Sequence, residues 1–163
     1  SATWTIINTP GASQNAVKIV AHDNVLARSS HLPSTAQPTE TYIALDREVF
    51  FNGEPVLMQH APAAHTDGDS IVFFRKSDVI STGDVFVTTS YPLILPGDGG
   101  SIQGVIAALN RIINLTVPAD KQEGGTYVVP GHGRLCDEAD LVEYRDMATI
   151  IRDRIADAIK KRL

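Results

Sequence analysis

Residues 64–74 read AHTDGDSIVFF, in which polar and turn-forming residues lead directly into a run of Ile, Val and Phe. Such apolar, β-branched and aromatic runs are typical of strands, and Asp and Gly ahead of them favour a turn. The stretch therefore predicts a strand over 70–74. It also predicts a turn that holds His65 just past the end of the preceding strand, 56–60.

Two more segments place a metal-capable side chain at a strand end. Ser81-Thr82-Gly83-Asp84 follows a predicted strand at 79–82, and Pro130-Gly131-His132-Gly133 follows one at 125–129. Glycine lets the backbone turn sharply beside such a side chain. His and Asp together form a donor set that zinc, iron or manganese accepts. Each segment also has a purely structural interpretation, as a hydrogen-bonded histidine, a turn or a kinked connection.

The rest of the chain predicts short strands first and helices later. The predicted strands before residue 90 lie at 3–7, 17–21, 41–45, 49–51, 56–60, 70–74 and 79–82. Asn52-Gly53 is a typical hairpin dipeptide and predicts that 49–51 pairs antiparallel with 55–59. A short helix is expected over 24–29 with Asp23 as its N-cap, followed by a loop over 30–40.

Two longer helices are predicted from apolar spacing. In 101–115 the apolar side chains recur on one helical face, and Ser101 is the expected N-cap. The same pattern runs from Asp137 to the end of the chain, with Asp137 as the cap. Lys160, at the other end, suits the negative pole of the helix dipole.

Composition limits the class of protein. The chain has 163 residues, is 43% hydrophobic and 20% charged, and carries a formal net charge of −5. These values predict one globular domain over 1–163, and the acidic balance argues against a nucleic-acid partner. The sequence shows neither a membrane-length apolar run nor a signal-peptide layout in 1–20, so no membrane association is expected and the cytoplasm is favoured. The single cysteine, Cys136, excludes an intrachain disulfide and a cysteine-rich zinc cluster.

The order of these segments resembles the metallo-β-lactamase superfamily of metal-dependent hydrolases, in its hydrolase or cyclase-like branch. The resemblance rests on AHTDGDSIVFF, DVISTGDVF, the GGSIQG helix start and VVPGHG, closed by a long helix. It implies an α/β (α+β) fold, an αββα sandwich with metals at one edge between two sheets. It further implies that His65 is a ligand of the first metal, Asp84 the bridging ligand and His132 a ligand of the second. His65 and Asp84 would be the catalytic residues, acting through the metal-bound water.

One departure from the superfamily changes this interpretation. Its HxHxDH signature follows a strand ending in Ile-Asn-Thr, which this chain has at 7–9, yet no His or Asp lies between Thr9 and Ala21. The simplest hypothesis is an internal loss of the segment that carries those ligands, together with an incomplete N-terminal half of the sandwich. We therefore expect a truncated domain that keeps the hydrolase scaffold, is weakly active or inactive, and holds zinc (or iron or manganese) at low occupancy or not at all.

Two alternatives stay open. The first is a working metal-dependent hydrolase of an unidentified ester, thioester, lactone or amide, with a mononuclear site or a site completed by a partner chain. The second is a metal-free module that binds a small molecule. An incomplete sandwich is also expected to expose an apolar sheet face and to form a homodimer through it. The candidates for that face are Phe50, Phe51, Val56, Leu57, Phe73 and Phe74.

Four further side chains have expected supporting roles. Asp67 and Asp69 are expected to be turn residues or carboxylates that support His65, since a carboxylate often orients a ligating histidine. His60, at the end of an apolar strand, is expected to be structural. Cys136 stands beside the cap of the last helix, where a lowered thiol pKa is conceivable, but an inert thiol is the preferred interpretation.

Overall fold

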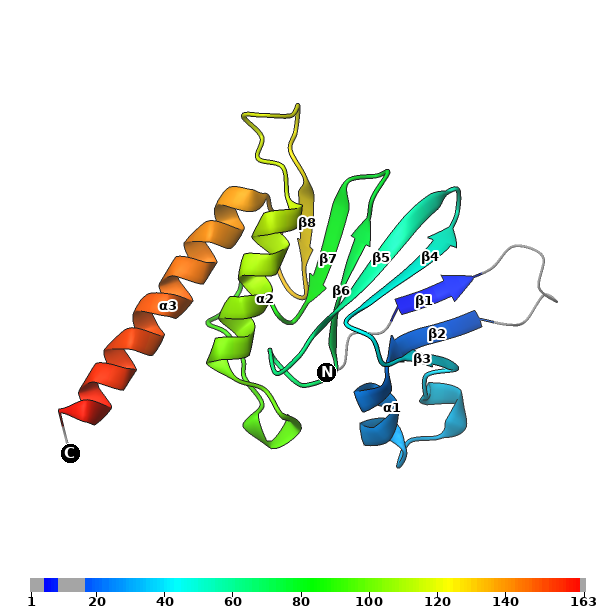
Figure 1. Cartoon of the computed structure of the whole chain (residues 1–163), viewed down its shortest axis with the longest axis horizontal. Coiled ribbons are helices and arrows are strands. Elements are labelled where there is room, and N and C mark those ends of the chain that lie inside the picture. The colour runs from blue at the N-terminus through cyan, green and yellow to red at the C-terminus, as the bar shows by residue number, and fades with distance from the viewer. Residues whose placement is uncertain (1–4, 9–16, 162–163) are drawn as a thin grey trace.

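Short apolar runs in the middle of the chain form a five-stranded sheet (Figure 1). The computed structural model describes residues 5–8 and 17–161, with the side chains of 18–161. The strands follow the order β4 (Asp46–Phe51), β5 (Glu54–Ala61), β6 (Asp69–Phe74), β7 (Val79–Gly83) and β8 (Tyr127–Pro130). Neighbours run antiparallel, except that β7 and β8 are parallel. The ends of β7 and β8 that lead into Asp84 and Gly131 therefore lie at the same edge of the sheet.

A smaller sheet of three strands precedes it in the sequence. Its order is β1 (Thr5–Asn8), β2 (Val17–His22) and β3 (Glu40–Tyr42), with β1 antiparallel and β3 parallel to β2. The parallel pairing of β2 and β3 requires a crossover, which α1 (Asp23–Ser29) and the 3-10 turn η1 (Ser34–Ala36) provide.

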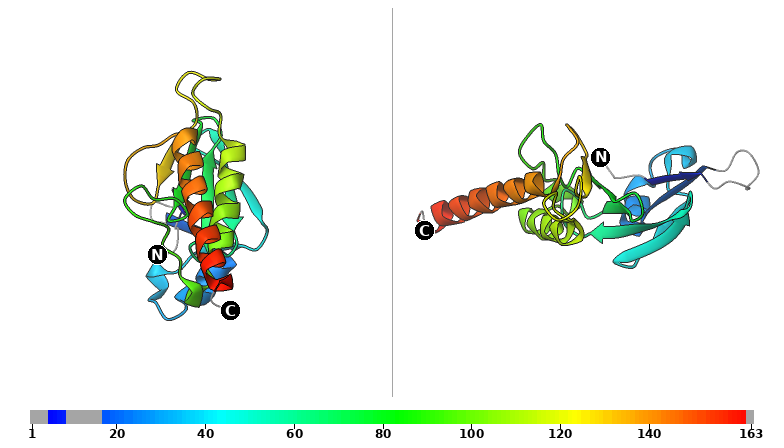
Figure 2. Two further views of the ribbon diagram at one scale, coloured as in Figure 1. Left: turned by 90° about the vertical axis from the view of Figure 1, so that its left-hand side faces the viewer. Right: turned by 90° about the horizontal axis from the view of Figure 1, so that it is seen from above.

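Two helices cover one face of the five-stranded sheet (Figure 2). They are α2 (Ile102–Leu115) and α3 (Glu138–Lys160), which pack against each other, and the 3-10 turn η2 (Pro96–Asp98) precedes α2. Together they bury the main apolar core, whose largest fully buried members include Phe86, Ile71, Ile80, Leu109, Ile112 and Leu141. Among the described residues, no helix is long and apolar enough to cross a membrane.

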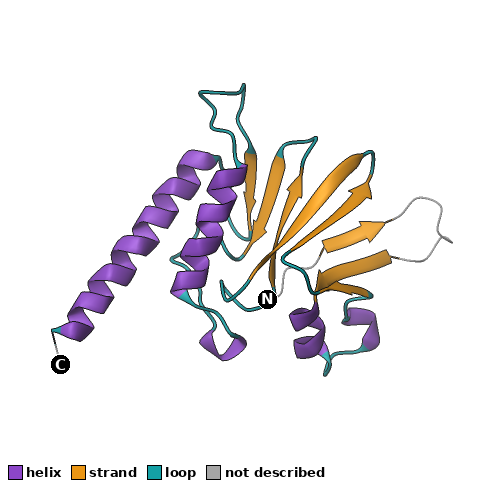
Figure 3. Cartoon of the chain, in the orientation of Figure 1, coloured by secondary structure: helices purple, strands orange, loops and turns teal. Residues whose placement is uncertain are grey.

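The opposite face of the five-stranded sheet contacts the three-stranded sheet. A second apolar cluster lies there, formed by Val20, Tyr42, Val56, Met58 and Val72. Successive residues of β6 alternate between the two clusters, as the two-residue period of a strand requires. The layers are thus helices, five strands and three strands, as Figure 3 shows by secondary structure. The expected α+β fold is confirmed.

The prediction of an exposed apolar sheet face is wrong in part. Val56 is 2% exposed because Val20 and Tyr42 of the three-stranded sheet cover it. Phe51 and Phe74 are half-buried against the same cluster. Of the six candidates, Phe50 is the one that is largely exposed to solvent, at 76%, and it lies on the edge strand β4.

The predicted elements hold, with local corrections. The Asn52-Gly53 hairpin is confirmed, although β4 begins earlier than predicted, at Asp46. The strand expected at 41–45 is β3, and it ends at Tyr42. The loop predicted over 30–40 contains η1. The strand expected at 3–7 is found as β1, and residues 3 and 4 lie outside the described residues.

The cap of α1 is also corrected. Asp23 is the first residue of the helix, and His22 is the N-cap because its ring nitrogen Nδ1 accepts the Asn24 backbone N–H at 3.3 Å. The caps predicted for α2 and α3 are confirmed, since Ser101 accepts the Gly104 N–H and Asp137 accepts the Asp140 N–H.

The N-terminal cap of α3 should make a measurable contribution to stability. Asp137 accepts the Asp140 N–H at 3.2 Å while the Asp140 carboxylate accepts the Asp137 N–H at 3.3 Å. Replacing Asp137 with alanine is expected to lower the free energy of unfolding by about 1 kcal/mol in urea denaturation. Replacing the exposed Glu143 of the same helix serves as the control and should leave stability unchanged. An unchanged midpoint for D137A would contradict a stabilising role for the cap.

Candidate functional site

His65 lies in the connection between β5 and β6 with its side chain fully buried. Its Nδ1 is 3.4 Å from Oδ1 of Asp69 at the start of β6. Its other ring nitrogen, Nε2, is buried and has no hydrogen-bond partner among the residues that the structure describes. A buried polar atom without a partner is costly, so the free Nε2 lone pair is the most informative feature of this histidine.

Asp69 explains how the ring is oriented. Its carboxylate, also fully buried, accepts the Thr66 backbone N–H at 2.7 Å and the Thr66 hydroxyl at 3.1 Å. Burial raises the pKa of Asp69, and the hydrogen bonds from Thr66 and the neighbouring His65 oppose that rise. Because the carboxylate accepts from every neighbour, it favours the proton on His65 Nδ1 and leaves Nε2 as a lone pair. Histidine metal ligands are held in this way.

The backbone around His65 is held by the start of α2. Ser101 donates its backbone N–H and its hydroxyl to the Ala63 carbonyl, each at 2.9 Å, and Leu95 donates its N–H to the His65 carbonyl at 3.0 Å. Ala63 itself has a φ of 55°, a left-handed conformation that costs a non-glycine residue energy and persists only where the surroundings fix it. An added Cβ on Gly100 would overlap the His65 carbonyl oxygen. The loop therefore presents His65 from a rigid support.

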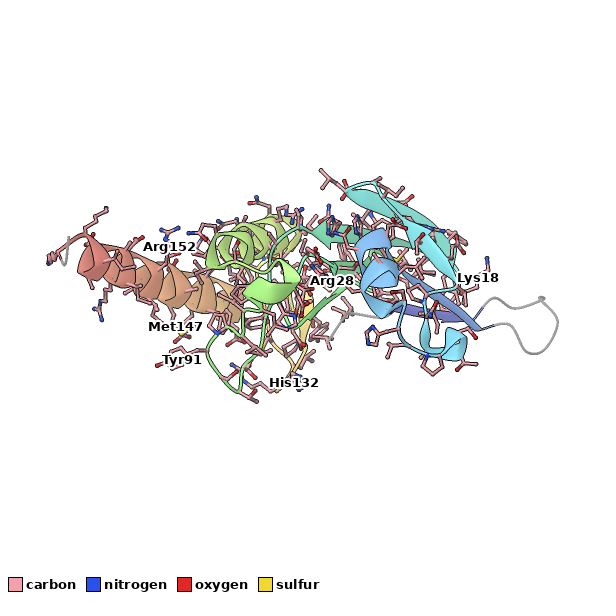
Figure 4. The ribbon with its side chains drawn as sticks, turned by 90° about the horizontal axis from the view of Figure 1, so that it is seen from below. Lys18, Arg28, Tyr91, His132, Met147 and Arg152 are labelled. Atoms are coloured by element: carbon pink, nitrogen blue, oxygen red, sulfur yellow. The ribbon has the colours of Figure 1, made fainter. Side chains whose placement is uncertain are left out.

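Asp84 and His132 form a second group at the adjoining ends of β7 and β8. Their contact is 3.4 Å between Asp84 Oδ1 and His132 Nε2. Gly83, with a φ of 53° at an irregular point of the β7–β8 ladder, turns the chain into Asp84. A Cβ on Gly131 would overlap the Asp84 carboxylate. The Asp84 side chain is 15% exposed, whereas that of His132 is 69% exposed, and Figure 4 shows His132 at the edge of the molecule.

Of the three predicted ligands, Asp84 and His132 contact each other, and His65 contacts Asp69. Within residues 5–8 and 17–161, no group of three or more His, Cys, Asp or Glu side chains is placed to hold a metal ion. A catalytic zinc needs three protein ligands and an open position for water. The His65 ring is oriented as a metal ligand would be, with Nδ1 towards Asp69 and Nε2 without a described partner. The donors that the described residues bring together nevertheless do not fit a complete metal centre.

An arginine clamp, which was not predicted from the sequence, anchors the loop on its other side. Arg28 of α1 donates from Nε and Nη2 to the two carboxylate oxygens of Asp67, at 2.8 and 2.7 Å, and from Nη1 to Asp98 of η2 at 3.0 Å. Hydrogen bonding to Arg28 lowers the pKa of Asp67. Figure 4 shows Arg28 in the middle of the molecule, where α1 meets these segments. No sequence signal links Arg28 to Asp67, since the three partners lie on separate elements.

Two residues considered in the sequence have structural roles here. Cys136 is buried in the main core, and burial raises the pKa of its thiol to about 11, which favours the inert thiol. His60 is buried, and its Nε2 lies 2.8 Å from the Asp67 carbonyl oxygen. Its ring also stacks on that of His22, a contact that sequence reasoning missed.

A separate apolar groove lies between α2, α3 and residues 91–94. It has a volume of about 520 Å³, and its lining includes Tyr91, Ile94, Ile151 and Ile155. Tyr91 and Arg152, which both line the groove, are labelled in Figure 4. None of the three predicted ligands lines it, so the groove is distinct from the predicted metal site.

Comparison with known proteins identifies the architecture. Similar solved structures include a metallo-β-lactamase from Pontibacter korlensis (TM-score 0.62, 17% identity, 82% of this chain) and the DIM-1 metallo-β-lactamase (TM-score 0.61, 17% identity, 83% of this chain). The chain has a metallo-β-lactamase-like fold. The sec-alkylsulfatase Pisa1 from Pseudomonas sp. shares it as well, with a TM-score of 0.61 at 12% identity over 77% of this chain.

These similarities are structural. No family profile matches the sequence, and no curated protein sequence matches it either. The chain spans 58% of the Pontibacter korlensis structure, 59% of DIM-1 and 20% of Pisa1. At these identities the metallo-β-lactamase-like fold is what the neighbours establish, and the expectation drawn from the sequence motifs is confirmed at that level.

Proposed function

We propose that this chain is a truncated metallo-β-lactamase-like domain that keeps the hydrolase scaffold, lacks most of the metal ligands and is weakly active or inactive as a hydrolase by itself. One observation carries the proposal: His65 and the Asp84–His132 pair do not form a group of three donors among the described residues. The segment 9–21, where the superfamily places further ligands, supplies no His or Asp. With too few ligands, a cation has no site that fixes an open water position.

A second candidate function rests on the orientation of the His65 ring. Its Nε2 is buried, unpartnered and oriented by Asp69, which is how a histidine is held when it binds a metal. A second copy of the chain in a homodimer would supply the missing donors. The assembly would then be a zinc-, iron- or manganese-dependent hydrolase of an ester, thioester, lactone or amide. The exposed Phe50 on the edge strand β4 supports association of copies through that edge.

Metal uptake separates the two candidates. The chain is purified without added metal, dialysed against zinc or manganese, freed of excess metal and subjected to elemental analysis, with light scattering to report its oligomeric state. We expect well below one metal per chain, equal amounts in wild type, H65A and H132A, and no hydrolysis of ester, thioester, lactone or amide probes.

The contrary result is equally clear. Stoichiometric metal that H65A and H132A both lose, together with metal-dependent hydrolysis, would overturn the inactive-scaffold proposal. If that metal is present only in a dimeric fraction, the partner-completed hydrolase is supported. His31→Ala is the matched control, because His31 is exposed in a polar loop and its loss should change neither metal content nor oligomeric state.

A further inference from the structure

We propose that the stacked imidazoles of His22 and His60 form a proton-sensitive joint between the two sheets, which loosens when the pH falls into the mildly acidic range. His22 ends β2 of the three-stranded sheet, and His60 lies in β5 of the five-stranded sheet. Their ring centroids are 3.5 Å apart with an interplanar angle of 10°. The residues are only 5% and 6% exposed, so the stack is part of the interface between the sheets.

The hydrogen bonds of the two rings fix which nitrogens donate and which accept. His22 Nδ1 accepts the Asn24 backbone N–H at 3.3 Å, which places the His22 proton on Nε2, 3.4 Å from the Ile43 carbonyl oxygen. His60 Nε2 lies 2.8 Å from the Asp67 carbonyl oxygen and therefore donates to it. Both rings thus use an Nε2–H as a donor to the backbone, and the contact from Asn24 requires His22 Nδ1 to be unprotonated.

Protonation of this pair removes contacts instead of adding them. A proton on His22 Nδ1 would face the Asn24 N–H, donor against donor, and the N-cap of α1 would be lost. Protonation of both rings would place two like charges face to face in a buried site, where they repel strongly. The imidazolium forms are therefore favoured in an opened state, where water reaches the rings.

Among the described residues, the carboxylates around the pair already accept hydrogen bonds from other groups. The ionisable groups on the elements packed around the pair include Asp23, Arg28, Tyr42, Asp46, Asp67, Asp69 and Arg111. Asp23 accepts from the Thr41 hydroxyl, Asp46 from the Gln59 amide and Asp69 from Thr66. Asp67, the nearest carboxylate in the loop, is bound to Arg28 through both oxygens. Arg111 of α2 donates to the His60 carbonyl at 3.0 Å and adds a positive charge nearby. Tyr42, whose ring meets His22 edge-on at 5.3 Å, has its pKa raised by burial and stays neutral.

The sign of the pH dependence follows from His60. Burial lowers the pKa of His60, and the nearby His22 and Arg111 lower it further, while the Asp67 carbonyl and carboxylate oppose the shift. An unfolded or opened chain has a histidine pKa of about 6.5, so it takes up protons at a higher pH than the closed form. The stabilising contribution is complete above that pH and is lost as the pH falls towards and through the lowered pKa of His60.

The junction between the three-stranded and five-stranded sheets is the part of the fold that should open first when the stabilising contribution of the histidine pair is lost. Among the side chains of residues 18–161, the cluster between the sheets has five buried members, against fifteen in the core under the helices. The Tyr42 hydroxyl also bonds the Ser70 hydroxyl across the junction at 2.7 Å, and this contact breaks if the sheets separate. Protons are therefore expected to act on α1, β2 and β3 before they act on β6 and β7.

Amide hydrogen exchange and histidine NMR together test the joint. The chain has five histidines, so the imidazole signals can be assigned and titrated one by one. Between about pH 7.5 and about pH 5, protection factors in α1, β2 and β3 should fall about tenfold for each pH unit by which His60 titrates below its unfolded value. Protection in β6 and β7 should stay constant over the same range, and the fall should coincide with the titration of the His60 ring.

The decisive variant is His22→Asn combined with His60→Gln. Asn is a good N-cap, and the Gln amide can still donate to the Asp67 carbonyl, so the hydrogen bonds are kept while the titrating rings are removed. The pH-dependent loss of protection should disappear in this double variant and persist in His31→Asn, the exposed control. Undiminished pH dependence in the double variant would overturn the proposal. If the double variant fails to fold, the wild type still decides: titration of the His60 ring without loss of protection in α1 and β2 would overturn the proposal too.

Discussion

Replacing Gly104 with alanine is expected to lower the free energy of unfolding by about 3 kcal/mol, although glycine-to-alanine changes usually stabilise a helix. Gly104 lies in the first turn of α2, directly against the loop that carries His65. An added Cβ would overlap the Ala63 carbonyl group and come within 2.9 Å of the Ala64 nitrogen. Both obstacles are backbone atoms, and Ser101 holds the Ala63 carbonyl with two hydrogen bonds, so neither can move cheaply.

Urea denaturation measures this effect, and Gly97→Ala is its matched control. Gly97 lies in η2, close to Gly104 in the chain, and a Cβ there would meet nothing within 4 Å. G97A should therefore change the free energy of unfolding by no more than about 0.5 kcal/mol. If G104A proved as stable as the wild type, or more stable, the loop around His65 would not be clamped by α2 as the structure shows it.

Local signals in the sequence were sufficient for the helices. The apolar spacing in 101–115 predicted α2 because those side chains pack on the sheet, and the positions of Ser101 and Asp137 predicted both caps. The Asn52-Gly53 hairpin was predicted for the same reason, since a turn of this type depends only on its own residues. Each of these features is decided within a few positions of the chain.

Features that depend on distant parts of the chain were not predictable in this way. His22 precedes α1 and Asp23 is its first residue, and the position of His22 as the cap is accompanied by its stack on His60 in the other sheet. The burial of Val56 likewise depends on Val20 and Tyr42, which cover it from another layer. Propensity and periodicity describe one element at a time and carry no information about which elements face each other.

In the candidate site, too, the local features were predictable from the sequence and the long-range contacts were not. The motif His65-Thr66-Asp67-Gly68-Asp69 brings the histidine and its orienting carboxylate together within one turn; the sequence predicted a carboxylate in this role and left open whether it was Asp67 or Asp69. Asp84 and His132 meet because β7 and β8 are parallel neighbours; the sequence predicted that each residue follows a strand, but not that the two strands pair. Their relation to His65 depends on the geometry of the whole sheet edge, which the motifs do not specify.

The second large effect is expected at Asp69, whose carboxylate is fully buried beside His65. Replacing Asp69 with alanine is expected to lower the free energy of unfolding by about 3 kcal/mol, because three buried donors lose their acceptor at once. They are the Thr66 N–H, the Thr66 hydroxyl and the His65 Nδ1–H. Thermal or urea unfolding measures the loss, and a D69A variant within about 0.5 kcal/mol of the wild type would contradict the network.

Asp69→Asn separates the stability of the network from its effect on His65. The amide oxygen can still accept from Thr66, so the loss of stability should be nearer to about 1 kcal/mol. The amide nitrogen, however, would donate to His65 Nδ1 and shift the histidine proton to Nε2. Nitrogen-15 NMR of the ring should therefore report Nδ1–H in the wild type and Nε2–H in D69N. An unchanged tautomer in D69N would mean that Asp69 does not set the orientation of His65. A switched tautomer would show that this carboxylate is what keeps the Nε2 lone pair of His65 available.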